Sequence, residues 1–260
     1  MISAFRELWQ FRDLFFVLIW REITIRYKHS VLGILWAVIQ PISMMTVFVI
    51  IFTKIMPVTL SAHPYPLFFY AALLPWTFFS TSLNYATPVL VDNYHLITKI
   101  SFPRALLPLT CLAVALVDLL ISLVFFFILL IIYNIPVSAF MLWLFPLMGL
   151  LFLFTFGTSL VVSSLNVYYR DVRHVTTLLI QLMFFATPIF YSTVAIQPPY
   201  RYLLFANPLT FIVEGLRTCT LDQKAIPSGE MAGATVIIMV FVVASWLFFK
   251  RMERRFADVI

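Results

Sequence analysis

Charged side chains are scarce in this sequence. They make up 11% of its 260 residues, while 63% of the residues are hydrophobic; an ordinary soluble domain has roughly 25% and 45–50%. This composition excludes a soluble fold and indicates that much of the surface faces lipid. The meaning of the net charge of +6 then depends on which side of the membrane the few basic residues lie. We expect no nucleic-acid partner.

Residues that build common catalytic and metal sites are also few. None of the six glycines is followed by lysine, so the loop that cradles nucleotide phosphates is missing. The two cysteines, Cys111 and Cys219, are far apart, and the four histidines show no metal-ligand spacing. We therefore expect no catalytic residue, no metal site and no nucleotide bound by this chain.

Long apolar segments are what the sequence has instead. Five of them reach the length of about 20 residues that a helix needs to cross the hydrocarbon core: 32–52, 67–85, 105–133, 141–165 and 231–249. A sixth segment, 175–191, is shorter. The pattern predicts an all-α integral membrane protein in which residues 1–260 form a single transmembrane domain with six transmembrane helices.

The basic residues lie mainly on one side of this predicted bundle. Of the 17 Lys and Arg, 13 fall before the first span, after the second, after the fourth or in the tail 250–260. The remaining four are Lys54, Arg201, Arg217 and Lys224. The positive-inside rule therefore predicts that both termini of this multi-pass protein are cytoplasmic.

Two further segments are too short or too polar to span. Residues 1–31 mix aromatic and charged side chains and predict an N-terminal interfacial amphipathic helix. The apolar run 14–20 is followed by Arg21 and Glu22 without a small-residue cleavage site, so we expect no cleaved signal peptide. Residues 202–221, between spans five and six, predict a re-entrant extracytoplasmic segment.

Asp118 is the one clear acidic residue inside a predicted span. Asp118 and Ser122, one helical turn apart, could hydrogen-bond to a neighbouring helix, and this is the simpler interpretation. The other interpretation is a role in transport, because ionisable residues inside membranes often have a function.

Four segments have a more specific pattern than composition alone. They are residues 21–36 with Gln40 and Pro41, residues 93–104, residues 166–173, and Asn207-Pro208-Leu209-Thr210 followed by Glu214 and Arg217. Together, and in this order, they resemble the permease subunit of an ABC-2 type exporter, of the branch that exports lipid-linked polysaccharides such as O-antigen, capsule or teichoic acid. The resemblance covers essentially the whole chain.

The resemblance implies a homodimer of six-helix permeases in the bacterial inner membrane. Each permease engages a separate cytoplasmic ABC ATPase subunit, in two copies, so ATP and magnesium belong to the partner chain and no cofactor to this one. The implied substrate is a glycan on a polyprenyl carrier, which passes between the two permeases.

The resemblance also assigns residues to coupling with the ATPase. Residues 91–104 look like the coupling helix; the alternative is a charged loop that only satisfies the positive-inside rule. For the segment after the fourth span, a local ion pair at the helix end is the alternative. The coupling residues are Asp92, Asn93, His95, Lys99, Arg104, Arg170, Asp171 and Arg173.

The interfacial helix and three spans supply the remaining site predictions. By resemblance the helix touches the ATPase and gates the cytoplasmic mouth, although it could be only an anchor; its gate residues are Arg21, Arg26, Tyr27 and Lys28. Polar and aromatic faces suit a sliding sugar chain, but Trp36 and Trp76 could instead lie in interfacial belts. The pathway residues are Trp36, Gln40, Ser43, Tyr70, Trp76, Ser80, Gln181, Phe184 and Tyr191.

Two other functions compete with glycan export. An exporter of drugs or small lipids would share the superfamily and would differ in the product missing from the cell surface. A membrane-embedded enzyme acting on polyprenyl-linked or phospholipid substrates would turn over without an ATPase and would depend on Asp118.

Overall fold

The computed structural model describes residues 9–28, 33–55, 63–254 and 256, and within them it is all-helical, without a strand. This confirms the predicted all-α class. The α-helices are α2 (Arg12–Lys28), α3 (Trp36–Ile50), α4 (Tyr65–Ala86), α5 (Val89–Asp92), α6 (Tyr94–Lys99), α7 (Leu106–Ile132), α8 (Leu144–Tyr168), α9 (Val172–Ala186), α10 (Pro198–Phe205), α11 (Pro208–Thr220) and α12 (Ser228–Glu253). Short 3-10 turns lie at Gly33–Leu35, Ala139–Trp143 and Thr193–Ala195, and a π-helical turn lies at Ile51–Ile55.

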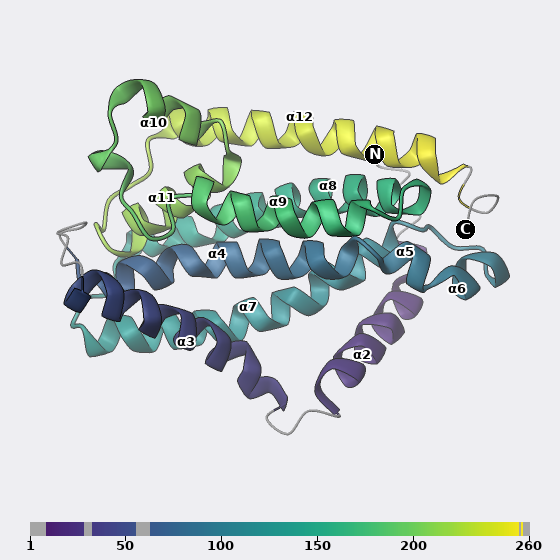
Figure 1. Cartoon of the computed structure of the whole chain (residues 1–260), viewed down its shortest axis with the longest axis horizontal. Helices are drawn as coiled ribbons and strands as arrows, with labels where there is room; N and C mark the ends of the chain where they lie inside the picture. The colour runs from purple at the N-terminus through teal and green to yellow at the C-terminus, as the bar shows by residue number, and fades with distance from the viewer. Residues whose placement is uncertain (1–8, 29–32, 56–62, 255, 257–260) are drawn as a thin grey trace.

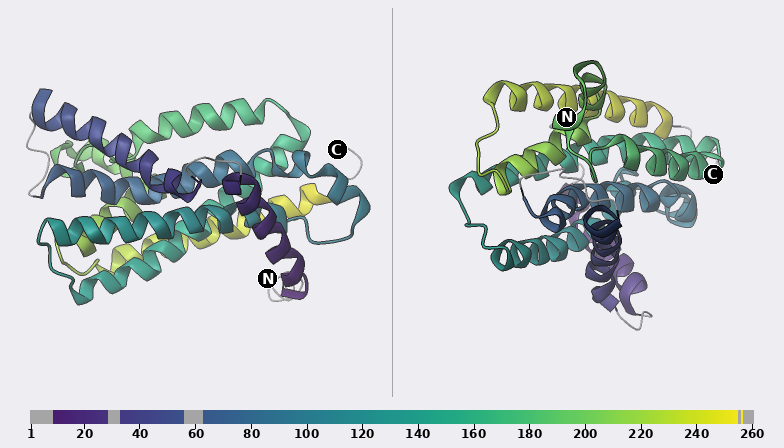
Figure 2. Two further views of the ribbon diagram at one scale, coloured as in Figure 1. Left: turned by 90° about the horizontal axis from the view of Figure 1, so that it is seen from below. Right: turned by 60° about the vertical axis from the view of Figure 1, so that its left-hand side comes forward.

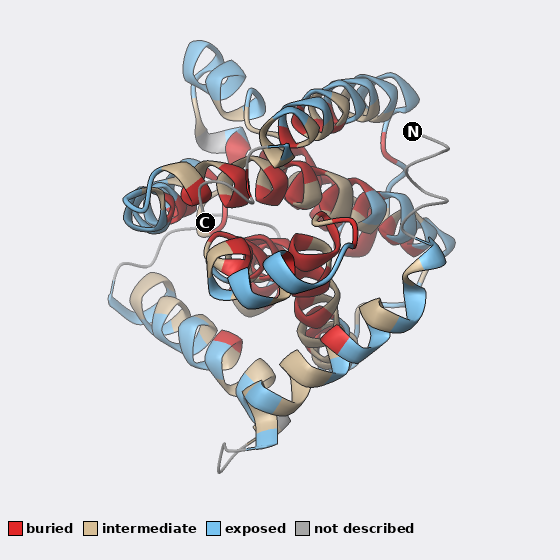
Figure 3. Ribbon diagram, turned by 90° about the vertical axis from the view of Figure 1, so that its right-hand side faces the viewer, coloured by how far each residue is buried: buried red, intermediate tan, exposed pale blue. Residues whose placement is uncertain are grey.

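The bundle is built around α4. Helices α7, α8, α9 and α12 run roughly along the same long axis (Figure 1), and α4 packs against α3, α7, α8, α9 and α11. In its most apolar stretch 78% of α4 is buried, against 6% for α3 with its π-helical turn. Viewed from one end, the buried residues gather in the middle of the bundle (Figure 3), so α4 is the core and the outer helices present their apolar faces outward.

Five helical segments are long and apolar enough to cross a membrane: Trp36–Ile55, Tyr65–Ala86, Leu106–Ile132, Ala139–Tyr168 and Ser228–Glu253. They coincide with the five long spans expected from the sequence, within a few residues at each end. Residue 32, where the first of these was expected to begin, lies outside the described residues. Pro41 and Pro75 sit inside α3 and α4, as proline can in membrane helices whose neighbours satisfy the freed carbonyls.

The expected fifth span is shorter than predicted. Helix α9 ends at Ala186, five residues before the predicted end at Tyr191, because Thr187 precedes Pro188 and has an extended backbone, with φ −95° and ψ 138°. Proline disfavours the helical conformation of the residue before it. The 15 residues of α9 leave the six-span count a prediction.

The predicted interfacial helix is α2, which projects from the bundle at an angle (Figure 2). Its apolar side chains are not confined to one face: Phe16, Val17 and Trp20 are all exposed, and Leu18 is its one buried residue. The amphipathic pattern expected from the sequence is therefore wrong for α2. Two of its charged residues, Arg21 and Arg26, do not need a separate polar face, because bundle residues bind them, as described below.

Helices α10 and α11 occupy the predicted re-entrant segment, at the end of the bundle opposite α5 and α6 (Figure 1). None of the α10 residues is buried, whereas most of α11 is. Asn207 caps α11 by accepting a hydrogen bond from the Leu209 amide at 3.1 Å, and its side-chain amide donates to Thr187 at 2.9 Å. The Asn-Pro pair thus begins α11 and fixes it to the residue that follows α9.

Arg217 on α11 is buried, with 4% of its surface exposed. Its guanidinium donates to the carbonyls of Phe68, Pro188 and Ile189 at 3.2, 2.7 and 2.7 Å, and to Glu214 at 3.0 Å. The same group lies 3.5 Å from the centre of the Phe68 ring. Arg217 therefore satisfies backbone carbonyls left open in the turn after α9.

We predict that Arg217→Met lowers the free energy of unfolding by about 3–5 kcal/mol, because three carbonyls and Glu214 lose their buried partner. Thermal unfolding of the purified chain in detergent measures this. The matched control is Arg251→Met, which removes an exposed arginine of α12. We expect its free energy of unfolding to stay within about 0.5 kcal/mol of that of the parent. An Arg217→Met chain that unfolds at the same temperature as the parent would contradict the claim that Arg217 stabilises the fold through these contacts.

Candidate functional site

Asp118 of α7 binds two side chains from the end of α2. Its carboxylate pairs with the Arg26 guanidinium at 2.6 Å and accepts a hydrogen bond from the Tyr27 hydroxyl. Burial, together with the Asp118 carboxylate, raises the pKa of Tyr27 to about 12, so the phenol stays protonated as the donor. We name Arg26, Tyr27 and Asp118 the α2 clasp.

The surroundings of the clasp strengthen it. The Arg26 guanidinium lies 4.1 Å from the centre of the Tyr85 ring on α4, a distance at which a cation is attracted to the ring face. One turn along α7, the Ser122 hydroxyl donates to the Ala37 carbonyl of α3 at 3.1 Å. Asp118 and Ser122 therefore both bind neighbouring helices, as the simpler interpretation of the sequence held, and they fix α2 and α3 to α7.

A cavity of about 410 Å³ lies beside the clasp. Its walls come from α2, the start of α3, α4 and α7, and it is lined by Arg26, Tyr27, Gly33, Trp36, Ala37, Gln40, Thr81, Asn84, Tyr85 and Asp118. Aromatic rings, amides, one cation and one carboxylate face a common space. Such a mixed lining suits a polar ligand with flat apolar faces better than a purely apolar one.

Two further cavities adjoin this one. A cavity of about 130 Å³ shares Trp36, Gln40 and Asp118 with it and continues between α3, α4 and α7. A cavity of about 310 Å³ shares Arg26 and Tyr85 with it and continues to Asp92 and Asn93. The three cavities therefore form a row under α2 and α3, from the segment predicted to couple to the ATPase into the bundle.

The structure brings four of the predicted pathway residues together. Trp36, Gln40, Trp76 and Ser80 line the 130 Å³ cavity. The five others do not line any of the three cavities: Ser43 and Gln181 are exposed, Tyr70 and Phe184 are buried, and Tyr191 is half-buried.

Phe184 belongs to an aromatic cluster that joins α3, α4 and α9. Its ring meets Phe48 and Trp76 edge-on at centroid distances of 6.0 and 5.5 Å, and Phe190 at 6.0 Å. Phe48 in turn stacks on Phe69 at 4.7 Å. These geometries are those of core packing, so Phe184 holds α9 to the bundle here, and its place on a pathway stays a prediction.

Two of the predicted coupling residues have partners in the bundle. The Asn93 side chain accepts a hydrogen bond from Arg21 of α2 at 2.8 Å. The Arg104 amide donates to the Glu253 carboxylate at 3.1 Å, and its guanidinium donates to the Glu253 carbonyl. The segment that contains α5 and α6 is thus fixed to α2 at one side and to the end of α12 at the other.

The six other predicted coupling residues and the gate residue Lys28 are exposed and can meet a partner, whereas the gate residues Arg21, Arg26 and Tyr27 bind side chains of the bundle. The exposed ones are Asp92, His95, Lys99, Arg170, Asp171, Arg173 and Lys28. In the described part of the chain, no ion pair joins Arg170, Asp171 or Arg173 to another residue, so the helix-end ion pair considered as an alternative does not form. Ile97 and Phe102 are buried beneath this surface and anchor it.

Sequence reasoning missed the partners of these residues. Asn84, Tyr85 and Glu253 all take part in the site. The sequence places Asn84 on the predicted polar face of span two, but Tyr85 and Glu253 were not singled out. Among the residues that the structure describes, no group of three or more His, Cys, Asp or Glu could hold a metal ion.

We predict that Asp118→Leu lowers the free energy of unfolding by about 1.5–3 kcal/mol, because Arg26 and Tyr27 lose a partly buried charged partner. The midpoint of detergent-induced unfolding measures the change. Asp222→Asn is the control, since Asp222 binds His63 at an exposed position and exposed pairs contribute about 0–1 kcal/mol. Equal effects of the two substitutions would show that the clasp contributes no more than a surface pair.

The chain resembles known transport proteins over its whole length. It is 33% identical to the O-antigen export system permease protein RfbA of Myxococcus xanthus, over 100% of both chains. It is 28% identical to the protein of the same name from Klebsiella pneumoniae, over 95% of both. The polysialic acid transport protein KpsM of Escherichia coli is 27% identical over 82% of this chain and 80% of its own length.

The match to a family covers the clasp, the three cavities and α11. Residues 13–221 match the family described as ABC-2 type transporter, and this range includes all four segments that carried the resemblance in the sequence. The chain belongs to the ABC-2 type transporter family.

Proposed function

We propose that this chain is the membrane-spanning permease subunit of an ABC exporter for a lipid-linked polysaccharide, an O-antigen-like glycan on a polyprenyl carrier. It moves this substrate from the cytoplasmic side across the bacterial inner membrane, and a separate ATPase subunit supplies the energy. As a member of a transporter family, the chain is a multi-pass membrane permease and not an enzyme, which confirms that prediction from the sequence.

The observation that carries the proposal is the full-length match to permeases named for O-antigen export, 33% identical over 100% of both chains. Relatives named for polysialic acid transport match over a smaller share. Drug or small-lipid export has no comparable support, since the relatives described above are named for O-antigen export or polysialic acid transport. The substrate class therefore follows from the relatives, and the site gives it a physical basis.

Six crossings require that α9 spans together with the turn that follows it. Its 15 residues extend about 22 Å, less than the hydrocarbon core of about 30 Å. Non-helical backbone can extend the span at membrane depth only where protein satisfies it. Arg217 satisfies the carbonyls of Pro188 and Ile189 in this turn. Helix α11 brings Arg217 to the turn because it packs back against α4 and α8, which supports a re-entrant α11.

The orientation follows from the basic residues. The end of the bundle with α6 and the last turn of α12 carries Lys99, Arg104, Lys250 and Arg251, and the positive-inside rule makes this end cytoplasmic. We infer that both termini lie there and that export runs from this end toward α10 and α11.

The exposed charges of the α5–α6 segment are the surface for the ATPase. Asp92, His95 and Lys99 face outward, whereas Asn93 and Arg104 join the segment to α2 and α12. A partner that moves α6 therefore moves α2, whose last turn holds the clasp beside the row of cavities. Two permeases and two ATPase subunits form the complete exporter.

The row of cavities suits the cytoplasmic part of a glycan pathway. Trp36 and Tyr85 offer ring faces, while Gln40, Asn84 and Asp118 offer hydrogen-bond partners for hydroxyl groups. Many such weak contacts let a chain slide, whereas one tight pocket would hold it.

We predict that Asp92→Ala with Lys99→Ala abolishes copurification of the ATPase and traps lipid-linked glycan inside the cell. Purification of the tagged permease and detection of the ATPase subunit in the eluate measure the first effect, and surface glycan on whole cells measures the second. The matched control removes an acid and a base from the opposite end, Asp222→Ala with Lys224→Ala, and keeps both properties.

Two outcomes would contradict the proposal. Normal surface polysaccharide in a strain that lacks this chain would exclude glycan export. Retained ATPase binding by the Asp92 and Lys99 variant, with export intact, would exclude the α5–α6 segment as the coupling surface.

A further inference from the structure

A separate cavity of about 630 Å³ lies between α10, the start of α11 and the first half of α12. It is far along the chain from the clasp, and it shares no residue with the three cavities under α2 and α3. Its size is in the usual range for small-molecule sites, about 300–1,000 Å³. Neither the clasp nor the coupling segment explains it.

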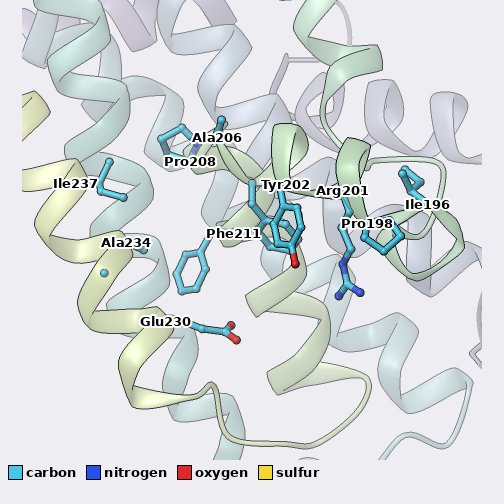
Figure 4. Close-up of a pocket in the computed structure, with 12 residues that line it drawn as sticks. Ile196, Pro198, Arg201, Tyr202, Ala206, Pro208, Phe211, Glu230, Ala234 and Ile237 are labelled. Carbon is cyan, nitrogen blue, oxygen red and sulfur yellow. The ribbon is translucent and has the colours of Figure 1, made fainter.

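Most of this cavity is apolar, with three polar groups at one side. Phe211, Ala234 and Ile237 form part of the apolar wall. In Figure 4 the polar ends of Arg201 and Tyr202 point downward, and the Glu230 carboxylate lies at the same lower side and extends sideways toward them. The ligand that fits is therefore an amphiphile, with its polar group on that side.

The charges of the site balance. Arg201 contributes one cation and Glu230 one anion, both exposed, and no ion pair joins either of them to another described residue. A ligand with only negative charge, such as a diphosphate, would be repelled by Glu230. A ligand with one negative and one positive group can meet both residues at once.

The apolar wall continues along the outside of a membrane span. Ile237 lines the cavity, and it is exposed on α12 together with Val236 and Val240. Gly233 leaves room beside them, because a Cβ added there would have no heavy atom within 4 Å. An acyl chain can therefore leave the cavity along α12 without crossing a polar surface.

We propose that this cavity binds a zwitterionic phospholipid with a primary ammonium group, of the phosphatidylethanolamine type. Its phosphate lies against Arg201, its ammonium donates to Glu230, and an acyl chain follows α12 from Gly233 toward Val240. The Tyr202 hydroxyl, at the same side of the cavity, is a further hydrogen-bond partner for the headgroup. The proposal needs α12 to span the membrane, but it does not depend on which substrate the permease exports.

Native mass spectrometry of the full-length chain tests this, with an equimolar mixture of phosphatidylethanolamine, phosphatidylcholine and phosphatidylglycerol of identical acyl chains. The expected result is a preference of roughly tenfold for the ethanolamine lipid, because the choline group has no N–H to donate and glycerol has no positive charge. Glu230→Gln removes the preference over phosphatidylcholine, and Arg201→Gln weakens retention of all three lipids.

Two variants separate the site from a general effect on the fold. Gly233→Leu fills the cavity without altering its charges and abolishes retention of the lipid, while Arg251→Ala at the other end of α12 leaves the preference unchanged. Soluble O-phosphoethanolamine, which has the headgroup but no acyl chain, does not displace the bound lipid at a similar concentration, because the acyl chain contributes to binding. Equal binding of the three lipids, a preference for phosphatidylglycerol, or an unchanged preference in Glu230→Gln would overturn the proposal.

Discussion

Hydrocarbon offers no hydrogen-bond partner, so the protein itself must satisfy each charge and each open carbonyl inside this bundle. Two arrangements do so. Asp118, midway along α7, is bound by Arg26 and Tyr27, and Arg217 binds three carbonyls and Glu214 at the end of the bundle with α10 and α11. Each joins a helix that does not itself span, α2 or α11, to the apolar core around α4. The same few polar contacts therefore determine where the non-spanning helices lie.

The position of α2 connects the two parts of the proposed mechanism. Arg21 meets Asn93 beside α6, and Arg26 meets Asp118 beside the row of cavities. A rigid helix between these contacts transmits a displacement from the ATPase surface to the cavity walls. Arg104 and Glu253 extend the connection to α12, so a push on the coupling segment reaches both sides of the bundle.

The length of the apolar segments made five of the spans predictable. Helical spacing also grouped four residues that share a cavity, Trp36 with Gln40 on one helix and Trp76 with Ser80 on another. The early end of α9 was also readable, since Pro188 is in the sequence and restricts Thr187. The partners of Asp118 and Arg217 were not, because 92 residues separate Arg26 from Asp118 and 149 separate Phe68 from Arg217. Local pattern shows that a polar residue needs a partner, but only the fold shows which one.

The clasp is the most direct point at which to test the account. Hydrogen exchange of the α2 amides measures how firmly α2 is held in Arg26→Gln, Asp118→Asn and the double variant. If the two side chains act through each other, each single variant exchanges faster and the double variant is no faster than the singles, a coupling of about 1 kcal/mol or more. Additive effects, or exchange that does not change in either single variant, would contradict the claim that this ion pair holds α2 on the bundle.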